Sequence, residues 1–135
     1  MGIATGPSME CYFGSHALPR ENQVNKTAVV AFHIPDLGIR FKAPFDAIDE
    51  VHSDFASLLA LLEFIDENQK YFAKNKDYKI FGDNLKVVNL VNGLETPPME
   101  YGSLMQKAKT YRQKYRFSLD WIPSKDNTSL ERNLD

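Results

Sequence analysis

The order in which strand-like and helix-like periodicities follow one another constrains this chain more than any other feature. Three apolar or β-branched runs come first, at 10–13, 27–34 and 39–45, and turn residues such as glycine and proline separate them. The run Thr27–Ile34 is apolar on both faces, which is typical of a buried strand. The run 39–45 alternates apolar and basic residues instead. Together the three runs predict an antiparallel meander.

Helical spacing begins after the meander. Apolar residues recur at helical intervals from Phe55 to Ile65 and predict a long amphipathic helix. Ser53 is the expected N-cap, and Asp54 is expected in the first turn, where a carboxylate suits the helix dipole. Further patterns predict a strand at 78–81, helices at 84–91 and 99–115, a strand at 116–122 and a last helix at 128–135. The resulting order, β-β-β-α-β-α-α-β-α, predicts a mixed α/β fold with helices packed on a five-stranded sheet.

Composition excludes several classes of protein. The chain has 135 residues, of which 43% are hydrophobic and 25% charged, an ordinary balance for one globular domain. We expect residues 1–8 to be a flexible lead-in or the remnant of a tag, and residues 9–135 to form the domain. The net charge of −2 gives no global signal for nucleic acid. No apolar run approaches the roughly 20 residues of a membrane span, so no membrane partner is expected. Cys11 is the only cysteine, which rules out an intramolecular disulfide and fits a reducing, cytoplasmic location.

Three acidic residues stand where one predicted element gives way to another. Asp54 opens the first long helix, Asp83 follows the strand at 78–81, and Glu131 lies in the last helix. In a mixed sheet such positions can converge, and converging carboxylates are best tolerated around a divalent cation. Carboxylate oxygens suit Mg²⁺ or Mn²⁺. Two such ions about 4 Å apart would support phosphodiester cleavage.

At these residues the chain resembles type 1 ribonuclease H. Residues 80–93 (IFGDNLKVVNLVNG) resemble the family's strand–aspartate–helix segment, in which the aspartate is a metal ligand. Residues 53–63 resemble its first helix and place Asp54 at a catalytic glutamate. Residues 121–131 resemble its closing segment and place Glu131 at the last catalytic aspartate. The resemblance spans nearly the whole of 9–135. It implies a ribonuclease-H-like fold with helices on both faces of the sheet, and cleavage of RNA paired with DNA. The hybrid would be recognised by its shape and by RNA 2′-hydroxyls.

The resemblance also implies roles for individual residues. Asp54, Asp83 and Glu131 are the expected catalytic residues and metal ligands, and Asp135 could substitute for Glu131. A purely structural role also stays open for three of them: Asp54 as a helix-dipole residue, Asp83 as a turn residue and Glu131 as a surface glutamate. The expected nucleic-acid contacts are one amide and five basic side chains, although a run of basic residues usually marks a solvated helix face. They are Asn84, Lys107, Lys109, Arg112, Lys114 and Lys125.

One departure from the family pattern decides the functional prediction. The family's first strand ends in Asp-Gly-Ser, and that aspartate bridges both metals, whereas this chain reads Phe13-Gly14-Ser15. Direct alignment places Phe13 at the lost position and a slip of one residue places Gly14 there; neither can bind a metal. We therefore predict a domain that binds RNA/DNA hybrid, with a degraded two-metal site and weak or no standard activity. Two alternatives stay open: an active divergent endoribonuclease, helped by His16 or Asp135, and a protein-interaction pseudoenzyme. Whether the domain is an enzyme, its oligomeric state and its place in a longer chain stay open as well.

Overall fold

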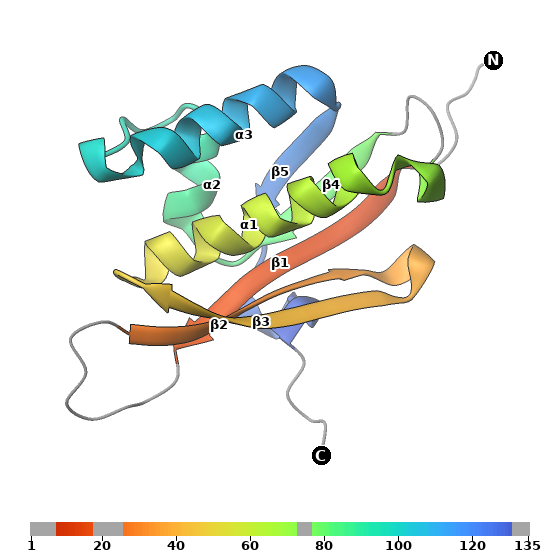
Figure 1. The fold of residues 1–135 in the computed structure, drawn as a ribbon, viewed down its shortest axis with the longest axis horizontal. Helices are drawn as coiled ribbons and strands as arrows, with labels where there is room; N and C mark the ends of the chain where they lie inside the picture. The colour runs from red at the N-terminus through yellow and green to blue at the C-terminus, as the bar shows by residue number, and fades with distance from the viewer. Residues whose placement is uncertain (1–7, 18–25, 73–76, 131–135) are drawn as a thin grey trace.

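The fold is built on one mixed five-stranded sheet. A computed structural model describes residues 8–17, 26–72 and 77–130. The strand order is β3-β2-β1-β4-β5, with β1, β2 and β3 antiparallel and β4 and β5 parallel to β1 (Figure 1). The strands are β1 (Met9–Ala17), β2 (Lys26–Ile34), β3 (Ile39–Ala47), β4 (Tyr78–Gly82) and β5 (Phe117–Trp121). The predicted meander, mixed sheet and strand order along the chain are confirmed.

Strand β1 is longer than the predicted run at 10–13. Residues Tyr12 to Ala17 pair with β2, so Gly14 and Ser15 lie inside the strand rather than in a turn. The backbone hydrogen bonds that β2 offers outweigh the turn tendency of Gly and Ser. Because side chains alternate along a strand, Phe13 and Ser15 share one face of the sheet, and Gly14 lies on the other.

The three α-helices lie together on one face of the sheet (Figure 1). They are α1 (Glu50–Glu67), α2 (Leu85–Val91) and α3 (Gly102–Lys114). The prediction that Ser53 caps α1 is wrong. Asp49 is the N-cap, and its carboxylate accepts a hydrogen bond of 2.8 Å from the backbone N–H of His52. Asp54 therefore lies in the second turn of α1 rather than the first, where packing has buried its side chain.

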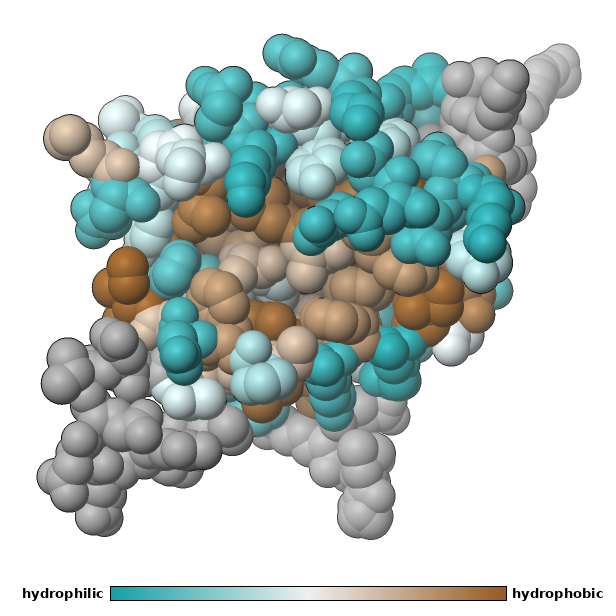
Figure 2. All heavy atoms as spheres, viewed as in Figure 1, coloured by the Kyte–Doolittle hydropathy of each residue, from teal (hydrophilic) through white to brown (hydrophobic). Residues whose placement is uncertain are grey.

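The core fills the space between this helical layer and the sheet. Cys11, Ile80 and Leu119 pair across β1, β4 and β5 and are each at most 2% exposed. Leu58 and Leu62 of α1 belong to the same cluster. Figure 2 shows hydrophilic side chains over α3 and a band of apolar ones across the middle of the face.

The second face of the sheet carries the end of the described chain. A 3-10 turn at Thr128–Leu130 packs against β1 and β2. It stands where the predicted last helix was to begin. Residues 131–135, including Glu131 and Asp135, lie outside the described residues, as do residues 1–7 of the expected lead-in. Among the described residues, no helix has the length and apolar character needed to cross a membrane.

Candidate functional site

The carboxylate of Asp54 is the centre of a small polar cluster. Asp54 is 6% exposed, and each of its oxygens accepts a hydrogen bond of 2.8 Å. Oδ1 accepts from the hydroxyl of Ser15 in β1, and Oδ2 accepts from the side-chain amide of Asn84. The hydroxyls of Ser15 and Ser53 lie 2.7 Å apart. Side chains from β1, α1 and the start of α2 thus meet around one buried carboxylate.

Asn84 holds this cluster to α2 because its side chain has two roles. Its Nδ2 donates to Asp54, while its Oδ1 accepts from the backbone N–H of Val87, 3.3 Å away, and caps α2. Asparagine is among the preferred N-cap residues for this reason. The amide is therefore oriented by the helix before it reaches the carboxylate.

Asp83 lies beside the cluster, directly after β4. The indole Nε1 of Trp121 donates to the backbone carbonyl of Asp83 over 3.2 Å and holds the end of the strand. The charge of Asp83 is one of the causes that raise the pKa of Asp54. Asp83 is therefore close enough for its charge to disfavour ionisation of Asp54.

Burial is the main reason that the pKa of Asp54 rises to about 6. Desolvation disfavours the charged form, and the negative charge of Asp83 adds to this effect. Hydrogen bonds from Asn84 and Ser15 lower the pKa but do not cancel the rise. Near neutral pH the ionised Asp54 is thus a charge that costs the fold free energy.

Asp54→Asn should change how stability depends on pH. A folded-state pKa raised from 3.8 to about 6 favours the fold fully below pH 3.8, and this contribution is lost as the pH rises through 6. Asn can accept from Asn84 and donate to Ser15, so it removes the titration with little change of shape. We expect the stability of Asp54→Asn relative to wild type to rise by about 2–3 kcal/mol between pH 3.5 and 7.5. Urea unfolding in EDTA measures it, and parallel pH profiles would contradict it.

Phe13 occupies the space beside the polar cluster. Its side chain is fully buried on the face of β1 that carries Ser15. A Cβ atom added to Gly82 would lie 2.3 Å from Cζ of Phe13, so the ring rests directly on the backbone of β4. The position next to the strand end that carries Asp83 is therefore filled by hydrocarbon.

Gly14 allows a close approach on the opposite face of β1. A Cβ atom there would lie 3.0 Å from both Nδ2 of Asn127 and Oγ of Ser129. Asn127 Nδ2 donates to the backbone carbonyl of Phe13 over 2.9 Å, and its Oδ1 accepts from Ser129. Gly14 thus faces the turn at 127–130, not Asp54.

The described residues do not fit a two-metal centre. Among them, no group of three or more His, Cys, Asp or Glu side chains is placed to hold a metal ion. Asp54 and Asp83 are two carboxylates only, and each oxygen of Asp54 already accepts one hydrogen bond from the chain itself. His16 follows Ser15 in β1 and so belongs to the opposite face.

The predicted basic contacts divide between two sides of α3. Lys107 and Lys114 share a hollow with Glu63 and Asp66, and Lys114 is paired with Asp66 at 2.8 Å. Lys109 and Arg112 line a different hollow, beside the end of α2. Lys125 is exposed in a 3-10 turn after β5. Of the predicted contacts, Asn84 is the one bonded to Asp54.

Ser15 and Ser53 belong to the Asp54 cluster although no sequence motif marks them as site residues. The Gly14-Ser15 pair was a usable signal, because a strand continued through it would have aimed Ser15 at the helical layer. Ser53 has the chemistry of a helix cap, which gives no sign of its contact with Ser15. The contact of Asn127 with the carbonyl of Phe13 joins residues 114 positions apart, which no local pattern reveals.

Neither a protein-family model nor a curated protein sequence matches the chain. Several solved structures do match the chain. Ribonuclease H1 from Halobacterium salinarum matches with a TM-score of 0.68 and 16% identity, over 91% of each chain. The N-terminal ribonuclease H domain of Rv2228c from Mycobacterium tuberculosis, solved as a fusion with maltose-binding protein, matches with a TM-score of 0.64 and 18% identity, over 90% of this chain and 87% of that one. LC11 ribonuclease H1 in complex with an RNA/DNA hybrid matches with a TM-score of 0.70 and 11% identity, over 89% and 88%. The chain therefore has the ribonuclease-H-like fold.

Proposed function

We propose that this domain binds RNA/DNA hybrids and cleaves them weakly or not at all. The observation that carries the proposal is the buried ring of Phe13, which lies on Gly82 where a metal-bridging carboxylate is expected. The hybrid as ligand is supported by the fold, because a structure of the same fold was solved in complex with one. Recognition would rest on the shape of the hybrid and on RNA 2′-hydroxyls.

The low activity follows from what two-metal hydrolysis requires. An oxygen shared by both ions holds them at the short spacing at which one activates water and the other stabilises the leaving oxygen. Phe13 supplies no such oxygen. Asp54 is held by Ser15 and Asn84, so its part in this proposal is to orient those two side chains at the binding surface.

A divergent nuclease is the second candidate, and the closeness of Asp54 and Asp83 favours it. In that case Asp54, Asp83 and Glu131, with Asp135 as a substitute, would be the catalytic ligands of Mg²⁺ or Mn²⁺. Asn84 and Lys125 would contact nucleic acid in either case. If the protein bound no nucleic acid, that result would favour the third alternative, a protein-interaction pseudoenzyme.

Binding is tested in EDTA, so that cleavage cannot interfere. We expect fluorescence anisotropy to show tighter binding of a 16-base-pair RNA/DNA hybrid than of the matching DNA duplex, with affinity falling as salt rises. Lys125→Glu should weaken hybrid binding about tenfold, since it reverses the charge of an exposed side chain that is expected to contact nucleic acid. Lys70→Glu, an equal charge change after α1, is the matched control and should leave the affinity unchanged. Equal binding of both duplexes, or an effect of Lys70→Glu equal to that of Lys125→Glu, would contradict the proposal.

A further inference from the structure

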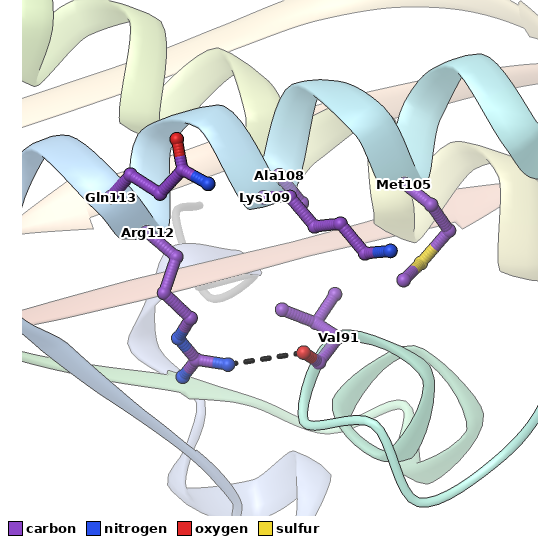
Figure 3. A pocket seen from close by; sticks show the side chains of 6 residues that line it. All are labelled: Val91, Met105, Ala108, Lys109, Arg112 and Gln113. Carbon is purple, nitrogen blue, oxygen red and sulfur yellow. Dashed lines mark hydrogen bonds between the residues drawn. The ribbon is translucent and has the colours of Figure 1, made fainter.

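Cationic side chains gather around Arg112, away from the cluster at Asp54. The parallel strands β4 and β5 begin on this side of the molecule, whereas Asp83 follows the opposite end of β4. Two hollows meet at Arg112. One, of about 240 Å³, lies between α3 and the end of α2 (Figure 3). The other, of about 410 Å³, lies at the first residues of β4 and β5.

The first hollow has an apolar floor and a basic rim. Val91, Met105 and Ala108 form the floor. Figure 3 shows the side chain of Lys109 running along α3 toward the end of Met105, and the guanidinium of Arg112 reaching to the Val91 carbonyl. Lys109 and Arg112 are three residues apart on α3 and therefore share a face of the helix.

Arg112 is held in place by the protein. Its Nη1 donates to the carbonyl of Val91 at 3.0 Å and to Oδ1 of Asn92 at 3.1 Å, and its Nη2 donates to the carbonyl of Phe117 at 3.4 Å. The guanidinium carbon lies 4.6 Å from the centre of the Phe117 ring. These bonds use three of the five N–H donors of the guanidinium, so the planar group is fixed in place and two donors remain for an anion.

The second hollow adds two cations. Lys79 of β4 and Arg116, next to β5, line it together with Arg112, and Asp77 is the one carboxylate among its described lining residues. Oδ1 of Asp77 lies 3.0 Å from Nε of Arg116, but the two side chains are 44% and 71% exposed, and so exposed a pair is weak. The chain as a whole carries a net charge of −2, so this excess of positive charge is local.

We propose that these four side chains form a track for the phosphodiester backbone of a single nucleic-acid strand. We name it the Arg112 track, and it consists of Lys79, Lys109, Arg112 and Arg116. Cations spread over two adjoining hollows match a chain of phosphates better than one small anion. Tyr115 and Phe117 line the second hollow and supply the aromatic surface typical of single-strand sites. The track rests on the proposed function for the class of its ligand, and it adds a second contact region away from Asp54.

The test uses the exposed members of the track, because Arg112 also joins α2 to β5. Lys79→Glu/Lys109→Glu should weaken binding of a labelled 20-nucleotide single-stranded DNA at least tenfold, measured by anisotropy in EDTA between 50 and 200 mM NaCl. The slope of log affinity against log salt should become shallower by about 1.4, the value for two lost contacts to a single strand. Lys42→Glu/Lys70→Glu, two exposed lysines outside both hollows, is the control with the same change of charge, and its affinity should stay within twofold of wild type. Far-ultraviolet circular dichroism of both variants checks that each is folded.

Each outcome separates the track from the proposed function. Equal affinities for the two double variants, or no binding of single strands by wild type, would overturn the track. If hybrid binding then still responds to Lys125→Glu, the proposed function survives without it. If single strands depend on Lys79 and Lys109 while hybrid is bound no better than DNA duplex, the track survives and the hybrid proposal fails.

Discussion

Phe13→Asp should destabilise the metal-free protein by at least about 3 kcal/mol and make its stability depend on divalent metal. Truncation of a buried phenylalanine alone costs about 3–5 kcal/mol. The new carboxylate would also lie buried beside Asp54 and Asp83, and like charges in one buried site repel. A divalent ion at millimolar concentration should restore about 1–3 kcal/mol if it binds only the folded state. Thermal unfolding in EDTA, Mg²⁺ and Mn²⁺ measures both effects.

Two controls identify the cause of this metal dependence. Phe13→Leu keeps the position apolar, so its melting temperature should be the same in EDTA and in Mg²⁺. Phe13→Asp/Asp83→Asn removes a neighbouring carboxylate and should lose most of the recovery. If Phe13→Asp melts at the same temperature with and without metal, Phe13 does not stand at a bridging position.

Gly82→Ala should destabilise the protein by about 3 kcal/mol, near the upper end of the usual cost of overpacking a core. The added Cβ would lie 2.3 Å from the Phe13 ring, and the ring is fully buried. Phe13→Leu should relieve the overlap, so Gly82→Ala should cost at least 1 kcal/mol less in that background. A double-mutant cycle by urea unfolding measures this coupling. Additive effects of the two substitutions would show that the ring does not rest on β4.

The sheet could be predicted from sequence because its signals are local. The apolar run of β2 and the alternation of β3 indicate which faces of these strands are buried. Each neighbouring helix or strand shows its own hydrophobic periodicity. The length of β1 could not be predicted in this way. Gly14-Ser15 has the local chemistry of a turn, and pairing with β2, a contact between distant segments, keeps it extended.

The sequence singles out Asp54 and Asp83 but does not reveal the hydrogen bonds that surround Asp54. Asp83 stands at the end of β4, which periodicity reveals, whereas Asp54 lies in the second turn of α1, one turn further into the helix than the sequence predicts. The partners of Asp54 depend on the register between β1, α1 and the start of α2, which is set by packing. The start of α1 shows the same limit, because Ser53 and Asp49 are both good caps, and the amide at His52 bonds to Asp49.

The basic residues of α3 show what a sequence run cannot resolve. Lys107, Lys109, Arg112 and Lys114 read as one patch along the chain. In the fold Lys107 and Lys114 face acidic residues of α1, whereas Lys109 and Arg112 face the end of α2. Whether the positive charge on one side of a helix is neutralised depends on the elements packed beside it. Only the structure therefore separates Lys107 and Lys114 from Lys109 and Arg112.

Hydrolysis of a labelled RNA/DNA hybrid tests the central claim most directly. The pure protein is incubated with the hybrid in Mg²⁺ and in Mn²⁺, beside an active ribonuclease H1 and the Asp83→Asn variant. We predict that the hybrid is bound and stays intact, or is cut at most weakly, because Phe13 replaces the carboxylate that two metals would share. Cleavage at a rate comparable to the active enzyme and abolished by Asp83→Asn would contradict this account.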